Sequence, residues 1–393
     1  MKSLRNVPLQ PRRDAWVEIN LGAIEENARA IRKLVPAHVS LMAIVKADAY
    51  GHGSAMVLNT LGASGVSMAG VAAIDEALHL REAGIKMPIL VIGVVPDWAV
   101  QYAIESDIQL TIFAQHHVES LRKAYQQAYQ KEGKAFKVHV KVDTGMHRIG
   151  IGWEEAADFI RQCQQLPFIQ LEGVFTHLAD SHDSALSQPQ LDRWRQVCSQ
   201  IDPLPRYIHI SNSGHALCPH AWDADSPSAT GNNLARLGIG FFGYGNHPQQ
   251  TNLVLKPAMS LKARIMHIQQ VPPRTGISYG HSYHTPETSI SRIATVPLGY
   301  SDGVPRILSG QIEGLLAGNR VPQVGKITMD QMMFNITDVP DAQVGDIITL
   351  IGSSQANQTE DAIWLDDWAK KANTIEYELM CALRVRLPKT YTR

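Results

Sequence analysis

Short apolar runs alternate with longer amphipathic segments along the first two thirds of the chain. Runs of four to six residues bounded by turn residues predict buried strands at residues 40–45, 66–71, 89–92, 109–113, 137–142, 171–176, 207–210 and 234–239. Apolar positions at helical spacing between them predict helices over residues 21–34, 54–61, 74–83, 118–132, 154–164 and 188–200.

This alternation predicts parallel strands joined by crossover helices. Eight strand-like runs within about 230 residues match the size of a (β/α)8 TIM barrel. A doubly wound open sheet also fits the alternation, but it does not require eight evenly spaced strands, and no G-x-G-x-x-G pattern follows the first run. We therefore expect an α/β fold with a barrel domain over residues 14–250.

The pattern changes after about residue 250. Gly and Pro turns separate β-rich segments at residues 258–270, 289–297, 321–327, 332–339 and 346–352, and one helical segment at 364–372 is the chief exception. We expect a second, mostly β domain over residues 255–393. The extended segment at residues 14–20 is expected to pair with it.

Composition narrows the class of protein. The 393 residues are 45% hydrophobic and 19% charged, with 36 basic against 37 acidic side chains, and no run of like charge predicts binding to nucleic acid or to an anionic membrane. The four cysteines form no C-x-x-C pair, which favours reduced thiols over disulfides or a zinc site. No metal site is predicted. The N-terminus lacks the apolar core of a secretory signal, and no apolar run is long enough for a membrane span, so we expect a cytoplasmic protein.

The most informative segment is residues 43–53, AIVKADAYGHG. An apolar strand ends in Lys46, and Tyr50 and a Gly-His-Gly loop follow directly. Burial disfavours the charged form of a lysine, which makes its amine a nucleophile toward an aldehyde. The alternative interpretation is a solvated lysine at the flank of a strand. The pattern around it favours a covalently held cofactor.

Other polar residues also follow predicted strands. In a barrel, function lies on the loops at the carboxyl ends of the strands. Those ends carry Lys46 and Tyr50, then Asp143 to Arg148, His177, Ser211 to Ser213, and Arg236 to Gly240.

Each of these residues also has a structural interpretation. His177 fits a hydrogen-bonded core histidine, and Ser213 fits the N-cap of a following helix. Arg148 fits an ordinary ion pair with Asp143. Glycines 238 and 240 fit a bend, although glycine also lets the backbone approach a ligand closely. The convergence of all of them on one side of the barrel favours a site.

Residues 43–53 resemble the pyridoxal-phosphate signature of the alanine racemases, which are fold-type III racemases. Five further segments match that family in the same order: KVDTGMHRIG at 141–150, RLGIG at 236–240, ISYG at 277–280, MDQ at 329–331 and NTIEY at 373–377. The resemblance covers residues 14–388 and implies a barrel followed by a C-terminal β domain. It also implies a homodimer whose active site is shared between two chains.

The resemblance implies roles for individual residues. Lys46 would bind pyridoxal 5'-phosphate covalently and serve as one acid/base group, and Tyr279 of the partner subunit would be the other. Arg236 would contact the pyridine nitrogen, with His177 orienting it. The phosphate would be held by Tyr50, Ser213, Gly238, Ile239 and Tyr377.

The remaining implied roles concern the substrate. Arg148 would lie near the substrate carboxylate, and Lys141 corresponds to a lysine that is carbamylated in members of the family. Met329 and Asp330 would approach from the partner chain. Thr328 stands where a cysteine is common in relatives.

The expected function is interconversion of L- and D-alanine by two bases on opposite faces of the cofactor, supplying D-alanine for peptidoglycan synthesis. One alternative is a racemase of broader scope acting on serine, lysine or arginine, against which Lys141 argues. A decarboxylase fits the paired Lys46 and Tyr279 less well. A non-catalytic protein that binds the cofactor is disfavoured by the β domain and by Tyr279.

Overall fold

The computed structural model describes residues 13–130, 133–218, 222, 232–245, 253–353, 361–383 and 386–393. The chain divides into two compact units. The barrel unit comprises Ile24–Ala49 and Gly53–Lys256, and the β unit comprises the chain up to Ala23, Tyr50–His52 and Pro257–Arg393.

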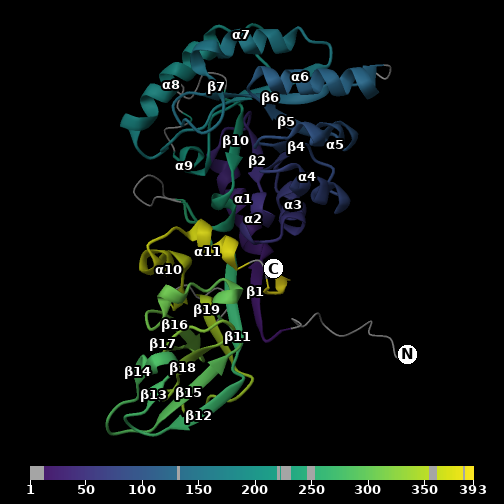
Figure 1. Ribbon diagram of the computed structural model, residues 1–393. Coiled ribbons are helices and arrows are strands. Elements are labelled where there is room, and N and C mark those ends of the chain that lie inside the picture. The colour runs from purple at the N-terminus through teal and green to yellow at the C-terminus, as the bar shows by residue number, and fades with distance from the viewer. Residues whose placement is uncertain are drawn as a thin grey trace, which may run out of the picture. The chain divides into compact units, whose positions relative to one another are not determined.

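Parallel strands form the centre of the barrel unit. Eight of them follow one another in the order β10-β2-β3-β4-β5-β6-β8-β9, and the two-residue strand β7 (Ile151–Gly152) pairs with β6 beside this path (Figure 1). The two strands at the ends of this order, β9 and β10, are also connected. The N–H groups of Asn233 and Arg236 donate to the carbonyls of Ile208 and Ser211 at 3.0 and 3.2 Å, which nearly closes the barrel. The bounds are β2 (Ser40–Ile44), β3 (Met68–Val71), β4 (Ile89–Val91), β5 (Ile108–Ile112), β6 (Phe136–Asp143), β8 (Ile169–Phe175), β9 (Tyr207–His209) and β10 (Leu234–Leu237).

Helices cover the outside of these strands (Figure 1). Their apolar faces are buried, as in α7, where Phe159, Ile160 and Cys163 face inward. The Asp183 side chain caps α8 by accepting from the N–H groups of Ala185 and Leu186. The bounds are α1 (Leu21–Leu34), α3 (Ser54–Ala63), α4 (Ile74–Glu82), α5 (Val100–Glu105), α6 (Gln115–Ala124), α7 (Trp153–Gln164), α8 (Ser184–Ser199) and α9 (Ser213–Ala216).

The β unit is built on one large sheet. Its strands run in the order β12-β15-β18-β17-β16-β19-β11-β1-β21, with β20 beside β19. β1 pairs antiparallel with β11 and parallel with β21. The bounds are β1 (Ala15–Asn20), β11 (Met259–Arg264), β12 (His267–Val271), β15 (Ser291–Val296), β16 (Glu313–Leu316), β17 (Asn319–Val324), β18 (Met332–Asn335), β19 (Ile347–Ser353), β20 (Ala362–Ile363) and β21 (Lys389–Thr392).

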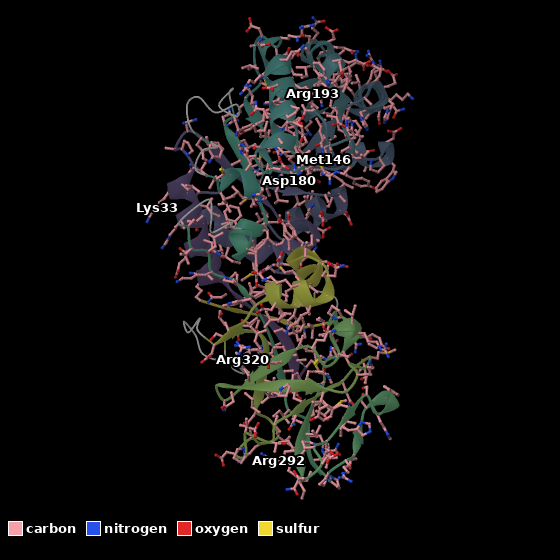
Figure 2. The ribbon with its side chains drawn as sticks, turned by 90° about the vertical axis from the view of Figure 1, so that its left-hand side faces the viewer. Lys33, Met146, Asp180, Arg193, Arg292 and Arg320 are labelled. Atoms are coloured by element: carbon pink, nitrogen blue, oxygen red, sulfur yellow. The ribbon has the colours of Figure 1, made fainter. Side chains whose placement is uncertain are left out.

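Smaller elements complete the β unit. The hairpin β13 (Gly276–Ile277) and β14 (Tyr283–His284) packs on the sheet through Ile277. Arg292 of β15, labelled in Figure 2, donates to the carbonyls of Val339, Pro340 and Ala342 and fixes the loop after β18. Two helices follow the last long strand, α10 (Leu365–Ala372) and α11 (Glu376–Ala382).

The predicted fold class, a (β/α)8 barrel followed by a mostly β domain, is confirmed, with local differences. Residues 258–270 form two strands, β11 and β12, rather than one continuous segment. Helix α5 was not predicted, because its six residues are too short for a clear periodicity. The predicted helix over 118–132 ends its α-helical part at Ala124 and continues as a π turn to Tyr129. No helix of the described residues is long and apolar enough to cross a membrane.

A pair of glycines in the β unit provides a test of the packing. Gly303 (φ 102°) has the carbonyl oxygen of Ala382 only 2.4 Å from where a Cβ would lie, whereas Gly310 (φ 74°) has open space there. Both substitutions to alanine carry the strain of a positive φ, about 1–2 kcal/mol. Gly303→Ala adds a backbone collision, so it should lower the free energy of unfolding by at least about 2 kcal/mol more than Gly310→Ala. Urea unfolding of both variants measures this difference, and equal losses would contradict the packing described.

Candidate functional site

The segment after β2 is a strained turn. Ala47, Asp48, Ala49 and Tyr50 have φ between 52° and 55°, so four consecutive residues other than glycine are left-handed. Such a turn costs roughly 1–2 kcal/mol per residue and persists only where its surroundings hold it. It follows Lys46, which is half-buried at the end of the strand.

Several hydrogen bonds hold this turn within the barrel unit. The Ala47 N–H donates to Glu76 Oε1 at 2.6 Å, and the Ser54 N–H donates to Asp48 Oδ1 at 2.8 Å. The Gly53 N–H also donates to the Asp48 carbonyl at 2.9 Å. These hydrogen bonds therefore fix the backbone beside Lys46. The sequence pattern indicated only a loop here and did not predict a fixed turn.

The loop after β6 is organised by Asp143. One oxygen of its carboxylate accepts from the N–H groups of residues 145, 146 and 147 at 2.9–3.1 Å. The Asp143 carboxylate is therefore hydrogen-bonded to the backbone of the loop and does not form an ion pair with Arg148, which is exposed. Arg193 of α8 donates to the Thr144 carbonyl at 2.8 Å and holds the same loop, on which Figure 2 labels Met146.

The Arg236 guanidinium is buried, with 5% of the residue exposed. Nη1 donates to the carbonyl and to Nδ1 of His209 at 2.8 and 2.9 Å. Nη2 donates to the carbonyls of Thr176 and Ile210 and contacts His177 Nδ1 at 3.3 Å. Burial lowers the pKa of Arg236 to about 9, which leaves it charged at neutral pH. His177 therefore lies within hydrogen-bond distance of Arg236.

Four cations converge beside His177. Burial, together with the smaller effects of the charges of Arg236, Lys141, Arg148 and Lys46, lowers its pKa to about 3. Burial also lowers the pKa of Lys141 to about 8, with the positive charges of Arg148, Arg236 and Lys46 adding to the effect and Asp143 opposing it. This excess of positive charge at the carboxyl ends of the strands suits an anionic ligand.

A small polar cradle lies at the ends of β9 and β10. The Ser213 hydroxyl accepts from the Gly238 N–H at 3.0 Å, and Ile239 then begins a buried 3₁₀ turn. The expectation that Ser213 is only an N-cap is wrong, because the cap of α9 is Asn212, whose side chain accepts from the His215 N–H. Ser213 keeps its hydroxyl proton to donate to a ligand.

Two tyrosines predicted for one role meet in the β unit. The rings of Tyr50 and Tyr377 pack edge to face, with their centroids 5.6 Å apart. Burial, reinforced by the nearby Glu376, raises the pKa of Tyr377 to about 12. Its phenol therefore stays protonated and serves as a hydrogen-bond donor.

Tyr279 lies on the β13–β14 hairpin with 73% of its surface exposed. The preceding Ser278 has φ 69° and ψ −176°, a conformation rare for any residue other than glycine. Two hydrogen bonds hold it: the Ser278 hydroxyl donates to the Lys326 carbonyl at 3.1 Å and accepts from the Lys326 N–H at 3.0 Å. These bonds hold the strained backbone from which Tyr279 projects.

The loop carrying Met329 and Asp330 is also fixed within the β unit. The Thr328 hydroxyl donates to the Gln331 carbonyl at 2.8 Å and accepts from the Gln331 N–H at 3.2 Å, which closes a tight turn. The Met329 carbonyl accepts from the Ser301 N–H at 3.1 Å, so only the N–H of its two backbone polar groups is left for a ligand.

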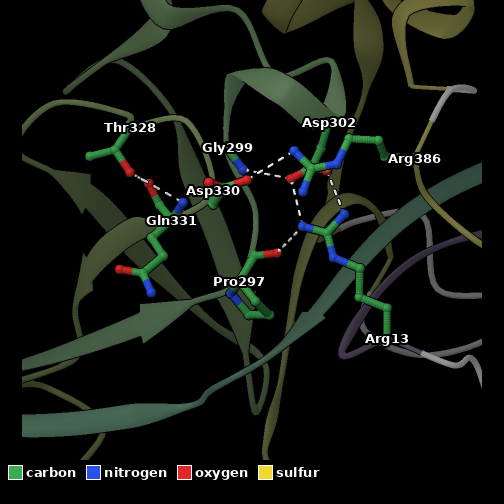
Figure 3. Close-up of polar contacts among 8 residues, drawn as sticks. All are labelled: Arg13, Pro297, Gly299, Asp302, Thr328, Asp330, Gln331 and Arg386. Atoms are coloured by element: carbon green, nitrogen blue, oxygen red, sulfur yellow. Dashed lines mark hydrogen bonds and ion pairs between the residues drawn. The ribbon is translucent and has the colours of Figure 1, made fainter.

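A charged network holds this turn from the other side (Figure 3). Arg386 donates to Asp330 Oδ1 at 2.9 Å and lies 3.5 Å from the buried carboxylate of Asp302. Asp302 also accepts from Arg13 and from the Gly299 N–H. Arg13, Asp302 and Arg386 were not predicted from the sequence, because ion pairs between distant segments leave no local pattern.

The structure thus brings Lys46, Lys141, Arg148, His177 and Arg236 together in the barrel unit, with Ser213 beside Gly238. In the β unit it brings Tyr50 to Tyr377, and it leaves Tyr279, Met329 and Asp330 exposed. The described residues contain no group of three His, Cys, Asp or Glu side chains able to hold a metal ion.

Known proteins share this architecture. Residues 19–246 match the alanine racemase N-terminal domain family, and residues 258–391 match the alanine racemase C-terminal domain family. The alanine racemase of a Nostoc species is 37% identical over 390 residues, which cover 95% of each chain. The alanine racemase structure from E. faecalis has a TM-score of 0.86 and 34% identity over 97% of this chain and 98% of that one.

A structure with another substrate in its name is also similar. The histidine racemase from Leuconostoc mesenteroides has a TM-score of 0.85 and 28% identity over 98% of this chain and 99% of that one. The fold is thus that of the amino-acid racemases, a class of isomerases. Within that class, this chain belongs to the alanine racemase family. The resemblance identified from the sequence motifs is confirmed.

The buried histidines of the barrel predict a pH dependence of stability. Burial lowers the pKa of His139 and His177 to about 3 and of His215 to about 4, and it lowers that of His209 well below its usual value. Between pH 7 and 5 the unfolded chain binds protons that the folded one does not, so stability should fall by about 1–2 kcal/mol per histidine. Asp366, whose pKa burial raises to about 6, opposes this by only about 1 kcal/mol.

Urea unfolding at pH 5, 6 and 7 tests the balance. We expect the free energy of unfolding to rise steadily with pH across this window. A flat profile would mean that these histidines take up protons in the folded protein.

Proposed function

We propose that the protein is a pyridoxal-phosphate-dependent alanine racemase that interconverts L- and D-alanine with two bases. The observation that carries the proposal is the convergence of Lys46, Lys141, Arg148 and Arg236 on His177, at the carboxyl ends of the barrel strands. Such a site suits a ligand with a phosphate and a carboxylate. The exposure of Tyr279 supports a contribution from a second subunit.

The donor set fits the cofactor. Lys46 supplies the primary amine that an aldehyde requires. The hydroxyl of Ser213, the backbone N–H groups of Gly238 and Ile239, and the phenols of Tyr50 and Tyr377 would hold the phosphate. The high pKa of Tyr377 keeps it a donor, which is the form that a phosphate dianion needs.

Arg236 would face the pyridine nitrogen, with His177 as its neighbour. Bound pyridoxal phosphate would stabilise negative charge on the α-carbon of the substrate. A guanidinium stays charged and cannot accept a proton, so it would keep the pyridine nitrogen unprotonated and limit delocalisation into the ring. This favours return of the proton to the α-carbon over transamination.

Inversion requires that a proton leave one face of the α-carbon and return to the other. Lys46 and the partner subunit's Tyr279 would serve as these two groups. A tyrosine and a lysine are ordinarily protonated at neutral pH, so each must be tuned by its surroundings to accept a proton.

Arg148, the Met329 N–H and Asp330 would contact the substrate, the latter two from the partner subunit. Lys141 is a candidate for carbamylation, because only its neutral amine reacts with carbon dioxide and its pKa of about 8 leaves part of it neutral. A carbamate there would exchange an excess positive charge for a negative one between Arg148 and Arg236.

The wider proposals follow from the family. The barrel domain would span 14–250 and the β domain 255–393, and the homodimer would work in the cytoplasm and supply D-alanine for peptidoglycan synthesis. Broader specificity is the second candidate, since a histidine racemase shares the fold. Measuring α-hydrogen exchange with alanine, serine, lysine, arginine and histidine distinguishes the two.

Complementation tests the shared site. Lys46→Ala and Tyr279→Phe should each lower kcat by at least about 10²-fold, as loss of an acid/base group does. In a two-fold dimer, mixed subunits restore one intact site in half of the dimers, so unfolding and refolding the two variants together should recover about a quarter of wild-type activity.

Two controls accompany this experiment. Tyr102→Phe removes an exposed hydroxyl from α5 and should leave kcat unchanged. Lys46→Ala mixed with the Lys46→Ala/Tyr279→Phe double variant should remain inactive. Mixed dimers without recovered activity would mean that each site is built within one chain.

A further inference from the structure

A row of polar side chains crosses the interior of the barrel one layer below Lys141. We name Gln109, His139, His209 and Arg236 the barrel relay. Each is at most 5% exposed, and both histidines are completely buried. Barrel interiors are usually filled by branched apolar residues, and buried polar groups cost free energy unless they are hydrogen-bonded. A polar layer inside the barrel therefore indicates a specific structural or functional role.

Three short hydrogen bonds connect the relay. Arg236 Nη1 lies 2.9 Å from His209 Nδ1, His209 Nε2 lies 2.9 Å from His139 Nδ1, and His139 Nε2 lies 2.8 Å from Gln109 Oε1. The four side chains come from β10, β9, β6 and β5, so the relay connects strands on one side of the barrel and leaves out β2, β3 and β4.

The direction of these bonds can be deduced from the Arg236 end of the relay. A guanidinium can only donate, so His209 Nδ1 must accept and its proton must sit on Nε2. His139 Nδ1 must then accept from that N–H, which places the proton of His139 on Nε2 as well. Gln109 must receive it with its carbonyl oxygen. The geometry permits one tautomer for each histidine, and both are neutral.

Gly173 makes room for this arrangement. It lies on β8, paired with His139 on one side and with Tyr207 on the other. A Cβ at this position would lie 2.4 Å from His139 Nδ1, the atom that accepts from His209. The φ angle of Gly173 is not positive, so glycine is not needed here for the backbone conformation. It is needed because a side chain would collide with the His139 ring. The His139 ring crosses β8 through this gap.

Gln109 is the final hydrogen-bond acceptor of the relay. Its amide oxygen accepts a hydrogen bond but does not take up a proton, so no proton can leave Arg236 along the histidines. Without an acceptor at residue 109, the His139 proton could move to Nδ1. His209 would then carry its own proton on Nδ1, facing the N–H of Arg236. Two donors would oppose each other, and Arg236 would lose one of its fixed contacts.

We propose that Gln109 is a positioning residue that acts through His139 and His209 to fix Arg236. The role in catalysis rests on the proposed function, in which Arg236 contacts the pyridine nitrogen. The hydrogen-bond direction does not depend on that function.

Nuclear magnetic resonance of the holoenzyme with ¹⁵N-labelled histidine tests the proposal, with signals assigned from His139→Gln and His209→Gln variants. In the wild type both histidines should carry the proton on Nε2 throughout pH 6–8. Gln109→Leu should populate the Nδ1 tautomer. It should also lower kcat about 10- to 100-fold, as is typical for hydrogen-bond partners of functional side chains, with KM changed by less than about threefold.

Thr111→Val is the matched control on the same strand. It removes a buried hydrogen bond, that of the Thr111 hydroxyl to the Val91 carbonyl, without touching the relay. It should leave the tautomers unchanged and kcat within about twofold of the wild type. Should Gln109→Leu fail to fold, Gln109→Glu keeps an acceptor and places a carboxylate beside His139. Because the acceptor for His139 Nε2 is retained, both histidines should keep the proton on Nε2 throughout pH 6–8, and an Nδ1 tautomer in this variant would contradict the relay.

The outcomes separate the two proposals. A racemase whose His139 or His209 carries the proton on Nδ1, or whose tautomers and kcat are indifferent to Gln109, overturns this inference alone. A protein with the stated tautomers and no racemisation of any amino acid overturns the proposed function and leaves the relay as a purely structural device.

Discussion

A guanidinium buried in the barrel is the constraint on which the rest of the site depends. Removing a charge from water costs several kcal/mol, and Arg236 is compensated by carbonyl oxygens and imidazole nitrogens rather than by a carboxylate. Its charge therefore remains unneutralised. Burial and this charge together lower the pKa of His177 and His209 and keep both neutral, and the charge also adds to the burial that lowers the pKa of Lys141. An anionic ligand is the natural complement of this arrangement.

Much of the fold could be predicted from the sequence, because buried parallel strands leave short apolar runs that differ clearly from amphipathic helices. The strand over 40–45 was predicted to within one residue of β2, and the helix over 21–34 matches α1. The left-handed turn after Lys46 could not be predicted. It is locally unfavourable and is held by Glu76, a residue far along the chain, so only tertiary structure selects it.

Some residues of the candidate site could likewise be predicted from the sequence, and others could not. Lys46, Arg236 and Tyr377 could be found because they stand in motifs that match a family. Gln109, His139 and Gly173 could not, because each looks like an ordinary strand residue and its role depends on neighbours in other strands. Whether a polar residue in a barrel strand points inward at a partner is decided by register across the sheet, which one sequence does not reveal.

In the proposed mechanism, two different groups act on opposite faces of the substrate α-carbon. Conversion of L-alanine in heavy water, followed over the first turnovers, distinguishes this from transfer by one group. Newly formed D-alanine should carry solvent deuterium at the α-carbon, because the group that gives the proton is not the one that took it. D-alanine that keeps the hydrogen of the L-alanine substrate would mean that a single group moves it across, and would contradict the two-base account.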